Sequence, residues 1–186
     1  MKFLKYALLA STLIFASCSD DDDNTPDPVN EEEVITTLIV SLEMINGQSG
    51  SDTVVMQYQD LDGDGPDAAT VTVSGSLNAN TVYDGSIVLL NETESPAENV
   101  TEEIEEEDLD HQFFYTVGSG LDVAAEYVDA DSEGNPLGLT FVLNTGVASS
   151  GGLTFTLRHE PNKPNTGLEN AGGETDIEVT FDVTVE

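Results

Sequence analysis

The chain has 186 residues, of which 37 are acidic and 4 basic, and its formal net charge is −33. So acidic a chain repels nucleic acid and anionic membrane surfaces, which makes both poor partners, whereas cations or a basic protein surface fit it better. Its single cysteine leaves no intrachain disulfide, and its length allows one domain with its own core.

The first 17 residues have the composition of a signal peptide. Lys2 and Lys5 precede an apolar stretch over residues 6–16, and small residues lead to Cys18. The stretch is shorter than the roughly 20 residues that a transmembrane helix needs. Its end resembles the bacterial lipobox, which implies that residues 1–17 are removed and that acylated Cys18 anchors the protein in outer-membrane lipid. A soluble secreted protein with a stray thiol is the alternative.

Residues 18–32 are predicted to form an acidic tether. Ser19 is followed by four aspartates, and a proline-containing spacer, NTPDPVN, comes next. The acidic run resembles the export tag of Bacteroidetes lipoproteins, which reach the cell surface. In other bacteria an acidic residue after the lipid-bearing cysteine goes with retention at the inner membrane. The match to the Bacteroidetes form favours an outer-membrane, surface-exposed lipoprotein.

Residues 33–186 are predicted to form a single all-β domain. Short segments rich in Val, Thr and Phe, many with alternating apolar residues, are separated by Gly, Asn, Asp and Ser. The predicted strands cover residues 34–42, 53–58, 69–74, 85–90, 113–117, 122–127, 137–143, 153–157 and 177–185. About nine short strands at this spacing indicate an antiparallel, immunoglobulin-like β-sandwich.

One segment differs from this pattern. Ser95-Pro96-Ala97-Glu98 has the form of a capping box with proline at the first helical position. Val100 and Ile104 fall on one side of the helix that would follow, and the rest of its surface is glutamate. We therefore expect one short surface helix ending near Glu107.

The domain also shows signs of an internal repeat. Residues 58–65, YQDLDGDG, align with residues 127–134, YVDADSEG, and a β-rich segment follows each copy. This pattern predicts two related halves of four strands each, joined by the helix and completed by a ninth strand.

The two aligned loops carry the first candidate metal sites. Alternating carboxylates followed by glycine resemble the first half of an EF-hand loop, although the glutamate at its twelfth position is missing. The calcium candidates are Asp60, Asp62 and Asp64 in the first loop, and Asp129, Asp131 and Glu133 in the second. Such loops would bind Ca²⁺ weakly. The alternative is an acidic turn, in which Asp and Gly serve the backbone alone.

A second candidate site lies around the two histidines. It comprises His111 together with Arg158, His159, Glu160 and Lys163. Histidine with nearby carboxylates binds Zn²⁺ or Cu²⁺, but this spacing lacks a second histidine two or four residues away. The basic pair Arg158 and Lys163 has a different expected role, in an internal ion-pair network or in binding a ligand carboxylate.

The sequence gives no sign of an enzyme. It contains no Gly-x-Ser-x-Gly elbow, no His-Glu-x-x-His and no phosphate-binding loop. Sugar-binding surfaces favour tryptophan, which the chain lacks. We therefore expect a binding or structural protein.

Three further segments carry a family resemblance. The tracts NETESPAENVTEEIEEE, LRHEPNKPN and AGGETDIEVTFDVTVE are similar to small flavobacterial surface lipoproteins labelled as type 1 periplasmic-binding-fold proteins. The resemblance implies a TonB-dependent receptor as partner. The fold label implies parallel strands in an α/β domain, which the β pattern of this chain does not fit.

Two functions follow from the sequence. The first is a ligand-capture or accessory module that delivers a cation, a metal complex or a small nutrient to a TonB-dependent receptor. The alternative is a structural or adhesive surface protein whose acidic loops are stiffened by calcium.

Overall fold

The computed structural model describes residues 33–45, 53–63 and 65–186. The signal peptide, the tether and the lipid anchor Cys18 predicted for residues 1–32 lie outside the described residues. Contacts group residues 32–186 into one compact unit. Within the described part, no helix has the length and apolar character needed to cross a bilayer.

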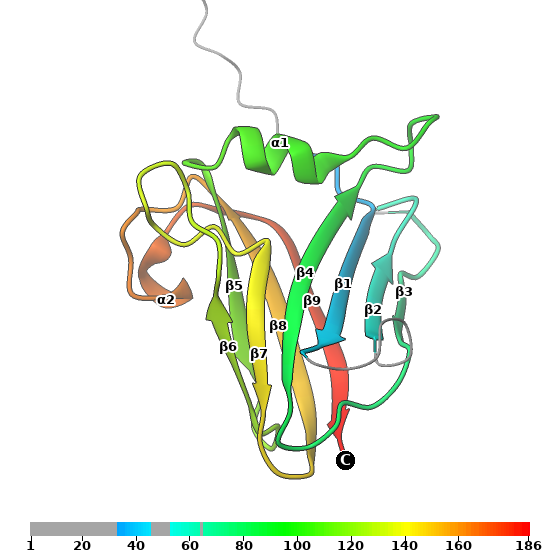
Figure 1. Ribbon diagram of the computed structural model, residues 1–186. Coiled ribbons are helices and arrows are strands. Elements are labelled where there is room, and N and C mark those ends of the chain that lie inside the picture. Colours follow the sequence, from blue (N-terminus) through cyan, green and yellow to red (C-terminus); the bar gives the residue numbers. More distant parts are fainter. Residues whose placement is uncertain (1–32, 46–52, 64) are drawn as a thin grey trace, which may run out of the picture. The chain divides into compact units, whose positions relative to one another are not determined.

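Two antiparallel sheets make up the described part of the chain (Figure 1). The larger sheet has the order β3-β2-β1-β4-β7-β6 and contains β1 (Thr37–Met44), β2 (Thr53–Gln59), β3 (Thr70–Val73), β4 (Val82–Leu90), β6 (Val123–Tyr127) and β7 (Thr140–Thr145). The smaller sheet has the order β5-β8-β9 and contains β5 (His111–Val117), β8 (Ser149–His159) and β9 (Glu174–Val185). The predicted nine-stranded antiparallel β-sandwich is confirmed for these residues, and it is not a closed barrel.

Alternation of apolar residues builds the core between the sheets. Along β9, every second side chain from Ile177 to Val185 is buried, and those between them are exposed. Phe155 of β8 is fully buried, and its ring centroid lies 5.8 Å from that of Phe141 in the other sheet. Gly85 of β4 lies opposite Phe141, where a Cβ atom would come within 2.4 Å of the aromatic ring. The absence of a side chain at Gly85 therefore lets Phe141 fill the core.

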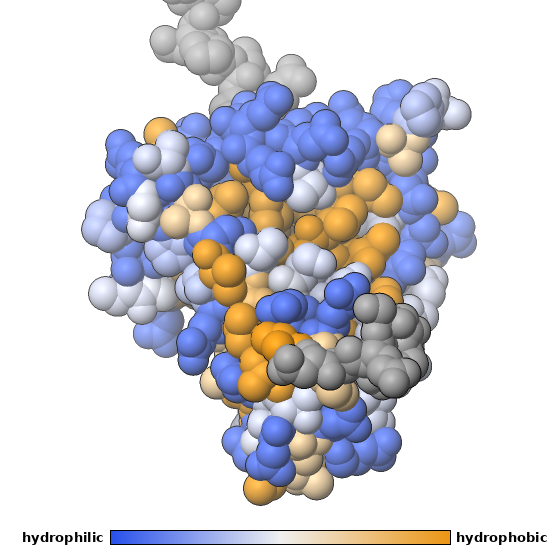
Figure 2. All heavy atoms as spheres, viewed as in Figure 1, coloured by the Kyte–Doolittle hydropathy of each residue, from blue (hydrophilic) through white to orange (hydrophobic). Residues whose placement is uncertain are grey.

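Helix α1 (Val100–Glu106) lies across one end of the sandwich (Figure 1). Val100 and Ile104 are buried, as the helical spacing predicted, and Figure 2 shows a hydrophilic outer surface in this region. The predicted capping box is wrong, because the helix begins after Asn99. The physical reason is that the backbone of Glu98 exchanges hydrogen bonds with Asn91, which keeps it out of a first helical turn.

The two halves of the chain are arranged differently. β1 to β4 all belong to the larger sheet, whereas β6 and β7 join that sheet and β5 and β8 belong to the smaller one. The aligned acidic loops therefore sit in different topological settings. A second short helix, α2 (Leu168–Ala171), lies between β8 and β9, where the sequence pattern predicted none.

Candidate metal centre

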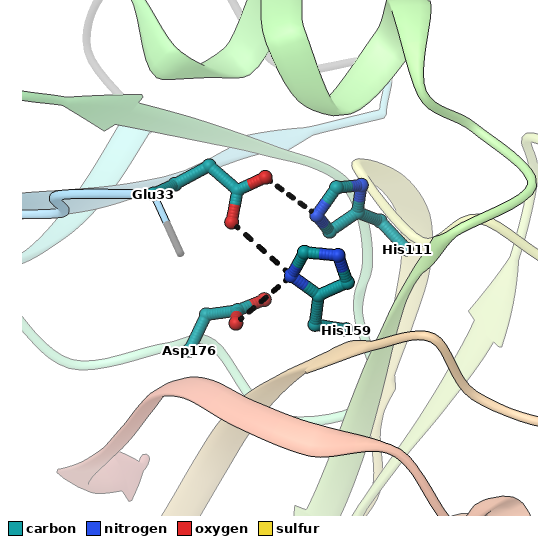
Figure 3. A group of neighbouring side chains, drawn as sticks. All are labelled: Glu33, His111, His159 and Asp176. Atoms are coloured by element: carbon teal, nitrogen blue, oxygen red, sulfur yellow. Dashed lines mark ion pairs between the residues drawn. The ribbon is translucent and has the colours of Figure 1, made fainter. Parts of the chain in front are cut away.

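Four polar side chains meet at the end of the sandwich that α1 covers (Figure 3). They are Glu33, His111, His159 and Asp176, which we call the His site. One ligand atom from each lies within 4.8 Å of all the others. The side chains are 0–6% exposed. So many ionisable groups at this burial require compensation, by shared protons or by a cation.

The histidines are brought together by β-sheet register. His111 is the first residue of β5 and His159 the last of β8, and the two are direct partners in the antiparallel ladder. Both follow the inward-facing alternation of their strands, in line with Phe113 and Leu157. Their ring centroids are 4.6 Å apart. A continuous ladder therefore fixes both imidazoles at the end of the core.

A β-bulge places Asp176 beside them. In the β8–β9 ladder Leu157 pairs with Ile177 but Arg158 with Thr175, so the register steps over Asp176. Such a bulge turns a side chain toward the face of the sheet opposite to the one that strict alternation predicts. The Asp176 side chain accordingly points inward and is 1% exposed. Its Oδ1 atom lies 3.6 Å from His159 Nδ1.

Glycine permits the tight turn before β9. Gly173 has a φ of +70°, and a Cβ atom there would lie 2.1 Å from the His159 carbonyl oxygen. Only glycine allows this backbone conformation and this close approach without strain.

Glu33 comes from a different part of the fold. It precedes β1, which belongs to the larger sheet, and it lies outside every strand. Its Oε1 atom is 2.9 Å from His111 Nε2, and its Oε2 atom is 3.6 Å from His159 Nδ1 (Figure 3). The carboxylate of Glu33 therefore bridges the two imidazoles.

The hydrogen bonding of His111 determines its proton state. Its Nδ1 atom lies 3.1 Å from the carbonyl oxygen of Glu107, the C-cap residue of α1. A carbonyl oxygen only accepts, so Nδ1 carries a proton. Nε2 then faces a carboxylate oxygen, and two acceptors do not share this distance without a proton or a cation between them. A metal-binding histidine commonly donates its second N–H to a backbone carbonyl in this way.

The electrostatics of the metal-free site agree with this description. Burial by itself would lower the pKa of His111, but the hydrogen bond and charge of Glu33 outweigh it and raise the pKa. Burial likewise acts to raise the pKa of Glu33, yet hydrogen bonds from His111 and from its own backbone amide lower it overall. Both shifts favour an ion pair between the His111 imidazolium and the Glu33 carboxylate in the metal-free site.

The negative charge around the site exceeds what the nearby basic residues can balance. In the described part of the chain the basic side chains besides the histidines are Arg158 and Lys163. Arg158 donates to the Gly172 carbonyl and to the Thr175 hydroxyl, and Lys163 pairs with Asp131. On α1, burial and then the charges of Glu98 and Glu33 raise the pKa of Glu103. Among the described residues, the positive charge closest to the carboxylates of Glu33 and Asp176 is therefore that of the imidazoles.

The remaining residues of the predicted histidine site lie elsewhere. The Lys163 side chain is 6% exposed, and its Nζ atom donates to the carbonyls of Asp108 and His111 and to the carboxylate of Asp131 at 3.1 Å. Lys163 thus forms an internal ion pair. Glu160 is exposed and its amide donates to the Asp110 carbonyl. Neither Lys163 nor Glu160 belongs to the four-residue cluster.

In the second acidic loop the carboxylates bind the protein's own donors. Both oxygens of Asp129 accept backbone hydrogen bonds, from Gly138 at 2.7 Å and from Thr140 at 2.8 Å. Asp131 accepts from the amides of Glu133 and Asn135 and from Lys163, while Glu133 itself is exposed. These contacts favour the acidic-turn interpretation for this loop, with the Lys163 ammonium group in the place of a metal ion.

The first acidic loop is different. Asp60, Asp62 and Asp67 line a hollow of about 190 Å³, and Asp64 lies outside the described residues. Asp62 Oδ2 accepts from the Asp67 amide at 3.1 Å. Asp60 Oδ2 accepts from Tyr58, whereas its Oδ1 is buried without a hydrogen-bond partner among the described residues. The calcium prediction for this loop stays a prediction.

Fold and site together define an all-β sandwich with a buried centre of two histidines and two carboxylates. No family model matches the chain, and comparisons with curated proteins and with solved structures found no similar protein. The functional argument therefore depends on the residues of the site.

Sequence reasoning missed Glu33 and Asp176. Glu33 is one of three consecutive glutamates at the predicted start of the domain, and nothing distinguishes it from its neighbours. Asp176 is brought inward by a bulge that alternation does not reveal. For the histidines a signal existed, because His111 and His159 both continue the inward-facing alternation of neighbouring aromatic and aliphatic residues.

Proposed function

We propose that this chain is a surface-anchored lipoprotein that binds one divalent transition-metal ion, Zn²⁺ above others, at the His site and supplies it to a TonB-dependent receptor. One observation carries the metal assignment. Two imidazoles and two carboxylates of low exposure meet within 4.8 Å, and His111 already donates its other ring N–H to a carbonyl.

The ligand set favours zinc. Four-coordinate Zn²⁺ is bound by imidazole nitrogen and carboxylate oxygen at about 2.0–2.2 Å and has no geometric preference from its d electrons. A divalent ion with neutral imidazoles also balances the two carboxylates, so the buried centre becomes neutral. Cu²⁺ binds such a site with high intrinsic affinity. The absence of thiolate ligands argues against soft Cu⁺.

Delivery to a receptor is supported by the location predicted from the sequence and by the charge of the protein. The resemblance of residues 1–23 to a lipobox with an acidic export tag favours the outer membrane, and the resemblance to flavobacterial lipoproteins implies a TonB-dependent partner. An acidic body concentrates cations near its surface. This part of the proposal is tested by co-purification of a receptor with the lipidated protein, and by loss of growth on scarce zinc in a deletion strain.

Zinc binding is tested on the untagged protein from Ser19 to Glu186, which retains the compact unit. After treatment with a chelator, zinc is titrated against a chromophoric competitor, and Co²⁺ is used as a spectroscopic substitute. We expect one ion per chain and a Co²⁺ spectrum typical of four-coordination, both absent in His111→Ala and His159→Ala. Glu160→Gln is the control, because Glu160 adjoins His159 but lies outside the cluster. If the wild-type protein does not bind zinc, this proposal is wrong, and the His site is a network of hydrogen bonds and ion pairs without a metal.

A second candidate function is favoured by the first acidic loop. Here the protein is a structural or adhesive surface domain whose loop is stiffened by Ca²⁺, and the observation is the buried, unpartnered Oδ1 atom of Asp60 beside a hollow lined by carboxylates. Millimolar Ca²⁺ should then raise the melting temperature, Mg²⁺ should not, and Asp60→Asn should abolish the effect. Asp129→Asn should leave the calcium effect in place.

A further inference from the structure

The four ligands of the His site differ in how firmly the fold holds them. His111, His159 and Asp176 belong to β5, β8 and β9, which are hydrogen-bonded neighbours in one sheet. Glu33 instead comes from the segment that leads into β1 of the other sheet. Three ligands are therefore fixed relative to one another, and the fourth approaches them from across the sandwich.

The segment that carries Glu33 is fastened to the sandwich at Thr36. The Thr36 amide and hydroxyl donate to the Leu90 carbonyl at 3.0 and 3.1 Å, and its own carbonyl accepts from the Asp60 amide. Glu33 lies three residues before this point. Val34 is 57% exposed, and Ile35 packs partly against the core. Moving Glu33 away from the histidines therefore leaves the bonds at Thr36 and the strands beyond it intact.

The contact between Glu33 and His111 is too short for both atoms to bind one metal ion. The Glu33 Oε1 atom is in direct contact with His111 Nε2, at 2.9 Å. Two ligands of one zinc ion each lie about 2.0–2.2 Å from it. At those lengths a tetrahedral arrangement separates the two ligand atoms by more than 2.9 Å. The separation of these two atoms therefore increases when one ion binds both, and Glu33 is the ligand that shifts, because it lies outside every strand while His111 is held in β5.

We propose that Glu33 is the exchangeable ligand of the His site, carried on a strap of residues 33–35 that is anchored at Thr36 and opens to admit and release the metal while the three sheet-bound ligands stay in place. This inference rests on the proposed metal-binding function. In the open state the ion keeps two imidazoles and Asp176 and gains a position that water or an acceptor's ligand can occupy. That arrangement is the usual one for zinc sites that exchange a ligand.

The two states of the strap have different roles. A closed strap would hold the ion during capture, and displacement of the strap would release it.

The test compares zinc release from the Ser19–Glu186 protein and its variants. Zinc-loaded protein is mixed with excess chelator, and the release rate is followed by the absorbance of the chelator complex. Glu33→Gln should still bind zinc, with weaker affinity and release faster by roughly tenfold or more, the scale on which single groups at metal sites act. His111→Ala should not bind. Glu103→Gln, which removes a neighbouring charge but no ligand, should release zinc at a rate within a few-fold of wild type.

Amide hydrogen exchange provides the second measurement. In the wild-type protein zinc should slow exchange in the peptide that covers residues 33–35, and in Glu33→Gln zinc should have no effect on that peptide. Three results would each contradict the strap proposal without contradicting the proposed metal site. They are equal zinc-release rates in wild type and Glu33→Gln, hydrogen exchange of the strap that does not depend on zinc, and complete loss of zinc binding in Glu33→Gln. Absence of zinc binding by the wild-type protein would overturn both proposals.

Discussion

His111 and His159 lie directly opposite each other on neighbouring strands, with their ring centroids 4.6 Å apart. Imidazole is the commonest metal ligand in proteins, and the sheet holds these two rings side by side, where one ion can bind both. The pairing of these two residues is thus the structural basis for the expected effect of zinc.

Zinc should therefore stabilise the wild-type protein but not the variants His111→Ala and His159→Ala. At a free concentration of 100 times Kd, a ligand adds roughly 2.7 kcal/mol to the free energy of unfolding. For a domain of this size each kcal/mol is worth about 2–4 °C in Tm. Thermal unfolding with and without zinc should show this rise in wild type and in Glu160→Gln, but not in His111→Ala or His159→Ala. An equal rise in His159→Ala would place the ion elsewhere.

Removing the ammonium group of Lys163 should strongly destabilise the fold. The group donates to two carbonyls and pairs with the buried carboxylate of Asp131, so Lys163→Met leaves a buried charge without its partner. Breaking such a pair costs about 3–5 kcal/mol. Arg158→Met is the control, with an expected loss of about 1 kcal/mol in the free energy of unfolding, because the hydrogen bonds of Arg158 are exposed. Denaturant unfolding measures the loss of stability in both variants, and similar losses in Lys163→Met and Arg158→Met would contradict this role for Lys163.

The same ion pair should make stability depend on pH. Burial acts to raise the pKa of Asp131, but hydrogen bonds from Asn135 and Lys163 lower it below the unfolded value of 3.8. A carboxyl group with a lowered folded-state pKa contributes stability above its unfolded pKa, and loses it as the pH falls through the folded value. The stability difference between wild type and Asp131→Asn should therefore shrink below about pH 4. Urea unfolding at pH 7, 5 and 3 measures it, and a constant difference would refute the prediction.

Two glycines provide a matched test of core packing. In Gly85→Ala the new Cβ atom would meet the ring of Phe141 at 2.4 Å, and overpacking of this kind costs about 1–3 kcal/mol. In Gly75→Ala the new Cβ atom would meet nothing within 4 Å, so the free energy of unfolding should change by no more than about 0.5 kcal/mol. Unfolding free energies of both variants check this, and equal values would show that Phe141 adapts without cost.

The sequence was most informative where a local pattern repeats. Alternation over residues 177–185 predicted β9 and its buried face, and the 3.6-residue spacing of Val100 and Ile104 predicted the buried side of α1. It was less informative where distant backbone partners compete with a local motif. The capping box at Ser95 failed for this reason, because Glu98 pairs with Asn91 instead of starting the helix.

By itself the sequence determined the class of fold, because strand periodicity and turn residues are local properties that require no knowledge of strand partners. It also determined the acidic charge, and it predicts a lipid anchor at Cys18. Only the tertiary structure decided the candidate site. The pairing of β5 with β8 sets His111 beside His159, a bulge turns Asp176 inward, and the segment before β1 adds Glu33. These three contacts join residues far apart in the chain, and they depend on which strands pair and in what register.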